Sequence, residues 1–180
     1  MLVGLQGSLP ATLHLCRRNT IKPRKPAATT GKDSQAGTPR GKIRKMADVV
    51  RADKDVLTQM MDRVLQEPRL ECCGLLAGRD GVITRVFAAT NATASATEYE
   101  IAPKELFLSM REIRGAGLEF MGIYHSHPDG DNKPSARDIS QAYYPDVAYF
   151  ILSPRKDTAT PVRAFSIRDG KAAELNVLIV

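Results

Sequence analysis

Residues 125–138, His-Ser-His-Pro-Asp-Gly-Asp-Asn-Lys-Pro-Ser-Ala-Arg-Asp, constrain the fold of this chain more than any other stretch. His125 and His127 are spaced i, i+2, so in an extended strand both side chains lie on the same face. The proline that follows ends the strand, because it has no N–H to donate to a ladder. Ser135 and Asp138 have the spacing of a capping box, which marks the start of a helix. The stretch therefore predicts a strand, a turn-rich loop and a helix, in that order.

The same residue types can hold a metal ion. Two imidazole nitrogens and one carboxylate oxygen are three ligands of a tetrahedral zinc site whose fourth position is open for water. The chain has only three histidines, and two of them lie here. A plainer interpretation is a strand histidine at position 125 followed by a helix cap. Both interpretations hold together if the cap aims Asp138 back at His125 and His127.

The pattern His-x-His-Pro, five residues, Pro-Ser-x-x-Asp resembles the signature of the JAMM, or MPN-plus, metalloproteases. That family also carries an upstream glutamate before a short Gly-Leu-Leu strand, and Glu71-Cys-Cys-Gly-Leu-Leu matches it. The resemblance covers roughly residues 48–180. It implies an α/β architecture, the MPN (JAB/cytidine-deaminase-like) fold, with a curved mixed β-sheet of about six strands and two or three packed helices.

By this resemblance, His125, His127 and Asp138 are the ligands of one Zn²⁺ per chain. Glu71 is the general acid/base that works on the metal-bound water, and Ser135 steadies the oxyanion of the tetrahedral intermediate. The chemistry suits these residue types, since zinc lowers the pKa of its water from about 15.7 to near 7. A carboxylate within hydrogen-bond reach can take the proton of that water and pass it to the leaving amine.

The resemblance also implies the substrate class. Family members hydrolyse a peptide or isopeptide bond after the C-terminal glycines of a ubiquitin-like or sulfur-carrier protein, and the compact, single-domain appearance is that of the prokaryotic type. An extended substrate tail could lie along a sheet edge by strand addition. Residues 91–99 are a candidate contact, although a simple surface connection explains them equally well. The alternative function is a non-catalytic MPN-type binding or scaffold module with a structural metal.

The remaining elements follow from hydrophobic periodicity and from turn residues. Three helices are expected. The first is capped by Asp53 and runs to about Gln66, the second has Pro103 in its first turn and ends at Gly115, and the third covers 135–142. Strands are expected over 73–77, 82–89, 118–125, 147–152, 162–167 and 174–180. Tyr124 should point away from the histidines and into the core.

The basic character of the chain belongs to its first quarter. Residues 1–45 hold ten Lys or Arg side chains and one acid, a balance of +9, whereas residues 46–180 have a balance of −3. We expect 1–45 to be a disordered basic tail and 46–180 to be the metalloprotease domain. The tail could contact nucleic acid, serve as a transit peptide, or be upstream translation with Met46 as the true start. We favour the last, so nucleic acid is not an expected partner.

Cysteine usage and hydropathy bear on the compartment. Cys72 and Cys73 are adjacent and poorly placed to bond each other, and Cys16 lies in the tail. We expect no disulfide, and instead small buried thiols in a reducing cytoplasm. No apolar run approaches the roughly 20 residues needed to cross a bilayer, so we expect no membrane partner.

Overall fold

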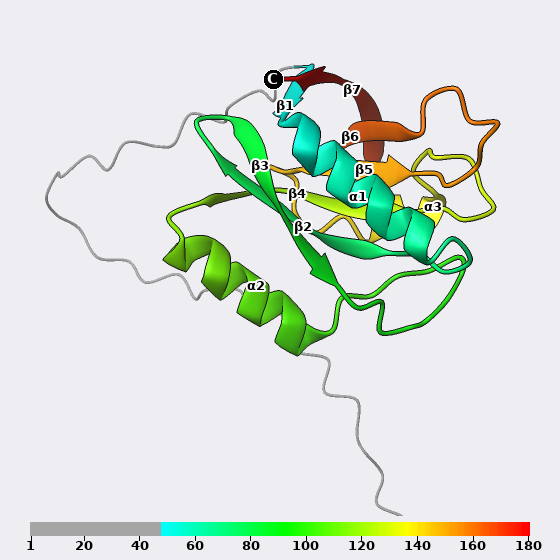
Figure 1. Cartoon of the computed structure of the whole chain (residues 1–180), viewed down its shortest axis with the longest axis horizontal. Coiled ribbons are helices and arrows are strands. Elements are labelled where there is room, and N and C mark those ends of the chain that lie inside the picture. Colours follow the sequence, from blue (N-terminus) through cyan, green and yellow to red (C-terminus); the bar gives the residue numbers. More distant parts are fainter. Residues whose placement is uncertain (1–47) are drawn as a thin grey trace, which may run out of the picture. The chain divides into compact units, whose positions relative to one another are not determined.

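A mixed β-sheet with three helices packed on it makes up residues 48–180, the part of the chain that the computed structural model describes (Figure 1). The predictions for the basic tail 1–45 and for a start at Met46 lie outside the described residues. The elements, in chain order, are β1 Val49–Ala52, α1 Lys54–Gln66, β2 Cys73–Arg79, β3 Val82–Ala89, α2 Pro103–Gly115, β4 Glu119–Ser126, α3 Ala136–Ser140, β5 Ala148–Leu152, β6 Val162–Arg168 and β7 Lys171–Ile179.

The sheet curves until it closes on itself, in the order β1-β3-β2-β4-β5-β6-β7. The predicted α/β class with a curved mixed sheet and three helices is confirmed, with one strand more than expected. The additional strand is β1, which pairs in parallel with β3 through Arg51 and Val82 and in parallel with β7 through Arg51 and Leu178. Four residues are too few to display a period of two, so the sequence pattern did not indicate this strand.

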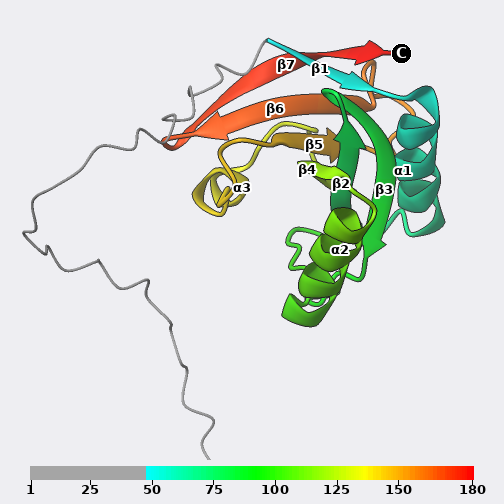
Figure 2. The ribbon, with the colours of Figure 1, turned by 90° about the vertical axis from the view of Figure 1, so that its left-hand side faces the viewer.

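Both faces of the central strand β2 are covered. Leu75 and Leu76 point to opposite faces, as neighbours in a strand must, and each is almost completely buried. On the Leu76 side, α1 presents Val56, Met60 and Val64, which recur at the four-residue spacing of one helix face. The Leu75 side packs against α2, so α1 and α2 lie on different sides of β2 and β3 (Figure 2).

The helices begin where the sequence predicts. The Asp53 side chain accepts a hydrogen bond from the backbone N–H of Asp55 at 3.0 Å and caps α1. Pro103 stands in the first turn of α2, where its missing N–H costs no hydrogen bond. None of the helices in residues 48–180 is long and apolar enough to cross a membrane.

Strand β4 carries the chain into the predicted metal site. Tyr124 is fully buried in the cluster around α1, as predicted, so its neighbour His125 faces the other side of the sheet. His125 lies opposite Cys73 of β2 and beside Ile151 of β5. The position of the histidine is therefore set by strands on both sides of β4.

Close packing at Gly74 brings β2 against its neighbours. A Cβ atom there would overlap the backbone carbonyl oxygen of Phe87 and the ring of Tyr124. Neither neighbour can move easily, because one is strand backbone and the other is a fully buried ring. Glycine at this position lets the strand that follows Glu71 approach the strand that carries His125.

Candidate metal centre

Three side chains converge at the end of β4. His125 lies in β4, His127 follows directly after it, and Asp138 lies in α3. The two Nε2 atoms are 3.0 Å apart, and the Asp138 carboxylate oxygens lie 3.3 Å from Nε2 of His125 and 3.4 Å from that of His127. One ligand atom from each residue lies within 4.8 Å of the other two. The structure thus brings together the three predicted ligand residues.

The backbone orients the ring of His127. Its Nδ1 lies 2.7 Å from the carbonyl oxygen of Asp131. A carbonyl oxygen only accepts, so Nδ1 carries the hydrogen and donates it. In the neutral ring this leaves the Nε2 lone pair free and aimed at the other two ligand residues, which is the usual arrangement for a ligating histidine.

Asp138 takes part both in the N-terminal cap of α3 and in the cluster with the two histidines. Its Oδ2 accepts from the backbone N–H of Ser135 at 2.7 Å, while its own N–H donates to the Ser135 hydroxyl at 3.1 Å. This reciprocal pair is the capping box predicted from the sequence. The cap holds the carboxylate over the imidazoles, so the structural and the metal-binding interpretations of this residue are compatible.

Glu71 is buried beside this cluster. Only 4% of the residue is exposed. Cys73 lies opposite His125 in the β2–β4 pairing, and the Ser126 N–H donates to the Cys72 carbonyl at 3.0 Å. The Glu71 carboxyl group lies close enough to His127 and Asp138 for their charges to shift its pKa. The pairing of β2 with β4 therefore brings the segment before β2 to the predicted ligand residues, which lie more than 50 positions later in the sequence.

The loop over residues 91–101 holds the backbone of Glu71. The Glu71 N–H donates to the Ser95 carbonyl at 2.9 Å, and the Asn91 side-chain amide donates to the Glu71 carbonyl at 3.0 Å. The Asn91 amide oxygen in turn accepts from the N–H groups of Thr93 and Glu100. These bonds fix the peptide units on both sides of Glu71.

Burial sets the proton affinity of Glu71. The pKa of Glu71 is raised from 4.5 to about 7, chiefly by removal from water; the charge of His127 opposes this rise, and the negative charges of Asp138 and Glu98 add to it. A carboxyl group with a pKa near neutrality can both accept and release a proton at physiological pH. This property matches the proton-transfer role expected of Glu71.

The surroundings shift the pKa values of the three predicted ligand residues in different directions. Burial lowers the pKa of His125 and favours its neutral form. Burial alone would raise the pKa of Asp138, but hydrogen bonds with His125 and His127 bring it well below its ordinary value. Burial lowers the pKa of His127, yet hydrogen bonds to Asp138 and Asp131 and the charge of Glu71 raise it overall. A metal ion therefore competes with a proton chiefly at His127.

Ser135 lies at the exposed rim of this cluster. Its hydroxyl oxygen accepts from the Asp138 N–H, which leaves its own hydrogen free to rotate toward a bound group. The five residues singled out in the sequence thus come from the segment before β2, the end of β4 and the start of α3.

Sequence reasoning missed contacts that complete the cluster. The ring of Tyr99 stacks on His125 at a centroid distance of 4.4 Å and an interplanar angle of 21°. Glu98, from the same loop, pairs with Arg137 of α3 at 2.7 Å. The sequence indicates residues 91–99 only as a candidate segment for substrate contact. No spacing rule connects Tyr99 to a histidine 26 positions later, so no local signal could have indicated the stack.

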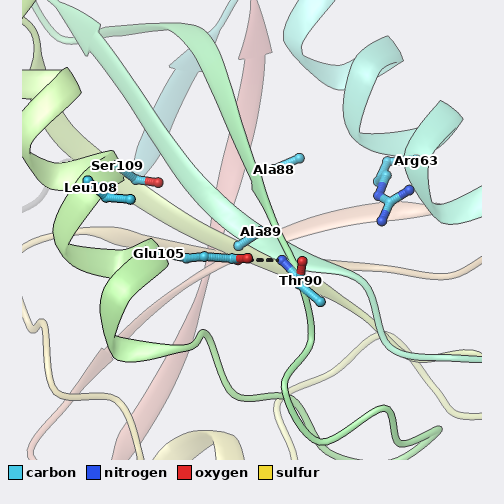
Figure 3. A pocket seen from close by; sticks show the side chains of 7 residues that line it. All are labelled: Arg63, Ala88, Ala89, Thr90, Glu105, Leu108 and Ser109. Atoms are coloured by element: carbon cyan, nitrogen blue, oxygen red, sulfur yellow. Dashed lines mark hydrogen bonds between the residues drawn. The ribbon is translucent and has the colours of Figure 1, made fainter.

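Two surface pockets of the described chain are lined by none of the three predicted ligand residues. One, of about 310 Å³, is formed by Gly130, Asp131, Asn132, Arg155, Asp157 and Thr158. The other, of about 240 Å³, lies along the end of β3 between Arg63 and the first turns of α2 (Figure 3). There the Thr90 N–H donates to the Glu105 carboxylate at 2.8 Å.

The donor set fits a divalent cation. Within residues 48–180, only His125, His127 and Asp138 form a group of three or more metal-ligating side chains whose donor atoms converge. Two neutral imidazoles and one carboxylate are three of the four ligands of a catalytic tetrahedral site. The geometry of the described chain is that of a candidate metal centre.

Comparison with known proteins identifies several relatives. Residues 53–168 match the family described as prokaryotic homologs of the JAB domain. A CysO-cysteine peptidase of Mycobacterium tuberculosis is 32% identical over 134 residues, which cover 73% of this chain and 90% of the peptidase. A probable TtuB-protein conjugate cleaving protease of Thermus thermophilus is 34% identical over 131 residues, which cover 72% of this chain and 84% of the protease.

A solved structure has a similar fold. The solution structure of protein DSY2949 from Desulfitobacterium hafniense aligns with a TM-score of 0.66 and 27% sequence identity. The alignment covers 73% of this chain and 92% of that protein.

Proposed function

The chain belongs to the family of prokaryotic JAB-domain proteins, and from this premise we propose that it is a zinc-dependent peptidase that cleaves the bond after the C-terminal glycine of a ubiquitin-like or sulfur-carrier protein. Two relatives are named for a cleavage reaction, one as a CysO-cysteine peptidase and the other as a probable TtuB-protein conjugate cleaving protease. The observation that carries the proposal is the buried carboxyl group of Glu71 beside the convergent His125, His127 and Asp138.

The proposed ligands of the zinc ion are His125 Nε2, His127 Nε2 and a carboxylate oxygen of Asp138. Bound there, zinc would supply Lewis acidity, which activates a water molecule and polarises the scissile carbonyl. The two imidazoles favour zinc over magnesium or calcium, because those ions prefer oxygen ligands. His127 is oriented by the Asp131 carbonyl and His125 is covered by Tyr99, so both rings are held before a metal arrives.

The residues of the chain divide the proton transfers and the charge stabilisation between them. The carboxylate of Glu71 takes a proton from the attacking water and then donates it to the leaving nitrogen. Burial raises its pKa to about 7 in the zinc-free protein, which supports a role in both transfers. The hydroxyl of Ser135 donates a hydrogen bond to the oxyanion that develops on the carbonyl oxygen. The ring of Tyr99 excludes water from one face of His125.

The domain boundaries and the compartment complete the proposal. We assign the catalytic domain to residues 46–180, which contain all five proposed functional residues. Cys72 and Cys73 are buried free thiols, which agrees with a reducing compartment such as the cytoplasm. We keep residues 1–45 outside the catalytic unit.

The proposal is tested with the purified full chain and a panel of small β-grasp proteins that end in Gly-Gly and are fused to a reporter. We expect about one zinc per chain, cleavage after the second glycine, loss of cleavage with a chelator and recovery on adding zinc. Glu71→Gln should abolish cleavage while zinc content and folding are retained. Hydrolysis that survives both complete zinc removal and Glu71→Gln would contradict the proposal.

The alternative, a non-catalytic module with a structural metal, predicts another pattern. Zinc would be bound, but the wild-type protein would cleave none of the fusions, and Glu71→Gln would change nothing. Burying an ionisable carboxyl group costs free energy, and a purely structural metal site does not require one that is not a ligand. The burial of Glu71 therefore favours the enzyme over the structural module.

A further inference from the structure

Asn132 is buried in an otherwise exposed loop. The sequence suggests a turn residue at this position, between Asp131 and Lys133, yet only 3% of Asn132 is accessible while both neighbours are exposed. Its side-chain amide donates a hydrogen bond to the carbonyl oxygen of Thr160, at 2.6 Å, in the connection between β5 and β6. A buried amide anchored in this way holds the backbone of the loop at one point.

The anchored residue shares a peptide unit with the acceptor of His127. The carbonyl oxygen of Asp131 accepts from Nδ1 of His127 at 2.7 Å, and the nitrogen of that same peptide belongs to Asn132. The direction of this carbonyl follows from the dihedral angles that flank the peptide. Fixing the side chain of Asn132 therefore limits the rotation of the one group that selects the tautomer of His127.

Other contacts hold the same loop to the same side of the sheet. Arg155 donates from Nη1 to the Asp129 carbonyl at 3.3 Å, and the Arg163 guanidinium lies 3.9 Å from the Asp131 carboxylate. Both involve exposed partners and are weak. Of these three contacts, only the bond from Asn132 to Thr160 is made by a buried side chain. This bond therefore contributes most to holding the loop in place.

We propose that Asn132 is a positioning residue of the metal centre, acting through the Asp131–Asn132 peptide to fix the ring orientation and the tautomer of His127. The inference rests on the metal site proposed above. Groups outside the ligands that orient a ligating histidine typically change metal affinity by about 10- to 100-fold when they are removed. Asn132 reaches its ligand through the backbone, so the lower end of that range is expected.

The test uses the full-length protein with Asn132→Ala, compared with the wild type. Zinc affinity is measured by competition with a chromophoric chelator, and we expect a loss of about tenfold. In the zinc-free proteins, nitrogen-15 NMR of the histidine rings reports which nitrogen of His127 carries the hydrogen. At a pH high enough for the His127 ring to be neutral, we expect Nδ1–H in the wild type and a mixture of both tautomers in the variant.

Thr158→Ala is the matched control, because it removes a hydroxyl hydrogen bond to Ser153 in the same β5–β6 connection without touching the Asp131–Asn132 peptide. It should leave zinc affinity and the ring signals unchanged. Should Asn132→Ala not fold, Asn132→Asp decides, since it keeps the shape and presents only oxygen to the Thr160 carbonyl.

Equal zinc affinity in the wild type and in a folded Asn132 variant would overturn the inference, as would an unchanged ring signal or an equal effect of Thr158→Ala. Failure of the proposed function is recognised separately. In that case the wild-type protein itself would either bind no zinc at the histidines or bind zinc and cleave none of the fusions.

Discussion

At the scale of single residues, the surroundings of Glu71 decide what its carboxyl group can do. An isolated glutamate before a strand is ordinarily a solvated charge, and only the neighbouring motif suggested otherwise. In the structure it is 4% exposed, both of its flanking peptides are hydrogen-bonded to the 91–101 loop, and its pKa is raised by burial. The protein thus keeps an ionisable group in a place where its charge is costly, which is typical of functional sites.

This cost predicts a pH-dependent stability of the zinc-free protein. Burial raises the pKa of Glu71 from 4.5 to about 7, so the folded state holds the proton more tightly than the unfolded chain. The stability gained from this proton is complete below the unfolded value and is lost as pH rises through the folded value. Glu71→Gln is neutral at every pH, so near pH 8 the zinc-free variant should be more stable than the wild type by up to about 3 kcal/mol.

Urea unfolding of both zinc-free proteins near pH 5 and near pH 8 measures this difference. Near pH 5 the two free energies of unfolding should lie much closer together. Glu100→Gln, at an exposed position of the neighbouring loop, is the control and should show no such pH dependence. A difference between wild type and Glu71→Gln that stays constant across this range would contradict the burial argument.

At the scale of elements, the first turn of α3 combines a cap with a proposed catalytic donor. Ser135 accepts from the Asp138 N–H and in return donates its own N–H to the Asp138 carboxylate. The helix is only five residues long, so its first turn depends heavily on these two bonds. The same bonds aim Asp138 at the histidines, and for this reason substitutions at Ser135 are expected to affect both stability and catalysis.

A substitution series at Ser135 separates the two roles. Ser135→Ala should lower the free energy of unfolding by about 1 kcal/mol through loss of the cap. It should also lower kcat by about 10²- to 10³-fold through loss of the oxyanion donor. Ser135→Asp retains a good capping oxygen but presents a negative charge to the oxyanion, so it should restore stability and not kcat. Ser135→Thr keeps both groups, and its failure to retain activity would argue against a hydroxyl donor.

The contact between β2 and β4 gives a second prediction at this scale. Gly74→Ala places a methyl group against the Phe87 carbonyl and the buried Tyr124 ring, so it should destabilise the fold by about 1–3 kcal/mol or more. Gly115→Ala, at the end of α2, has no atom within 4 Å of the added methyl and should be neutral or slightly stabilising. Thermal unfolding of the two variants measures the contrast, and equal melting temperatures would contradict the packing argument.

At the scale of the whole described chain, two features connect segments that are far apart in the sequence. One is the closure of the sheet, and the other is the candidate metal centre. Strand β1 bridges β3 and β7, which are otherwise the two ends of the sheet. The ligand cluster then ties β4 to α3, outside the barrel pairing. A bound ion would therefore stabilise the folded state against the unfolded chain, because the unfolded chain does not hold the three ligands together.

Zinc removal tests this linkage. Free zinc at about 100 times its dissociation constant should raise the free energy of unfolding by about 2.7 kcal/mol, and a chelator should reverse the change. Asp138→Ala removes one ligand, and its melting temperature should respond far less to zinc. An equal response of the wild type and Asp138→Ala would mean that the ion binds elsewhere.

The local sequence determined the element order and the composition of the site. His125 and His127 share a face because strands alternate, Ser135 and Asp138 cap a helix because of their spacing, and Val56, Met60 and Val64 face the core because of helical periodicity. These are short-range rules. The family resemblance carried by the two histidines, Ser135, Asp138 and Glu71 adds the prediction of a metal site to these local rules.

Only the tertiary structure decided the contacts between segments far apart in the chain. The stacking of Tyr99 on His125, the inward turn of Asn132 toward Thr160, and the closure of the sheet by β1 all depend on strand register across many residues. The burial of Glu71 belongs with them, because its solvent exposure depends on a loop that begins twenty positions later. Local patterns determine which way a side chain points along its own element, whereas long-range packing determines what that side chain meets.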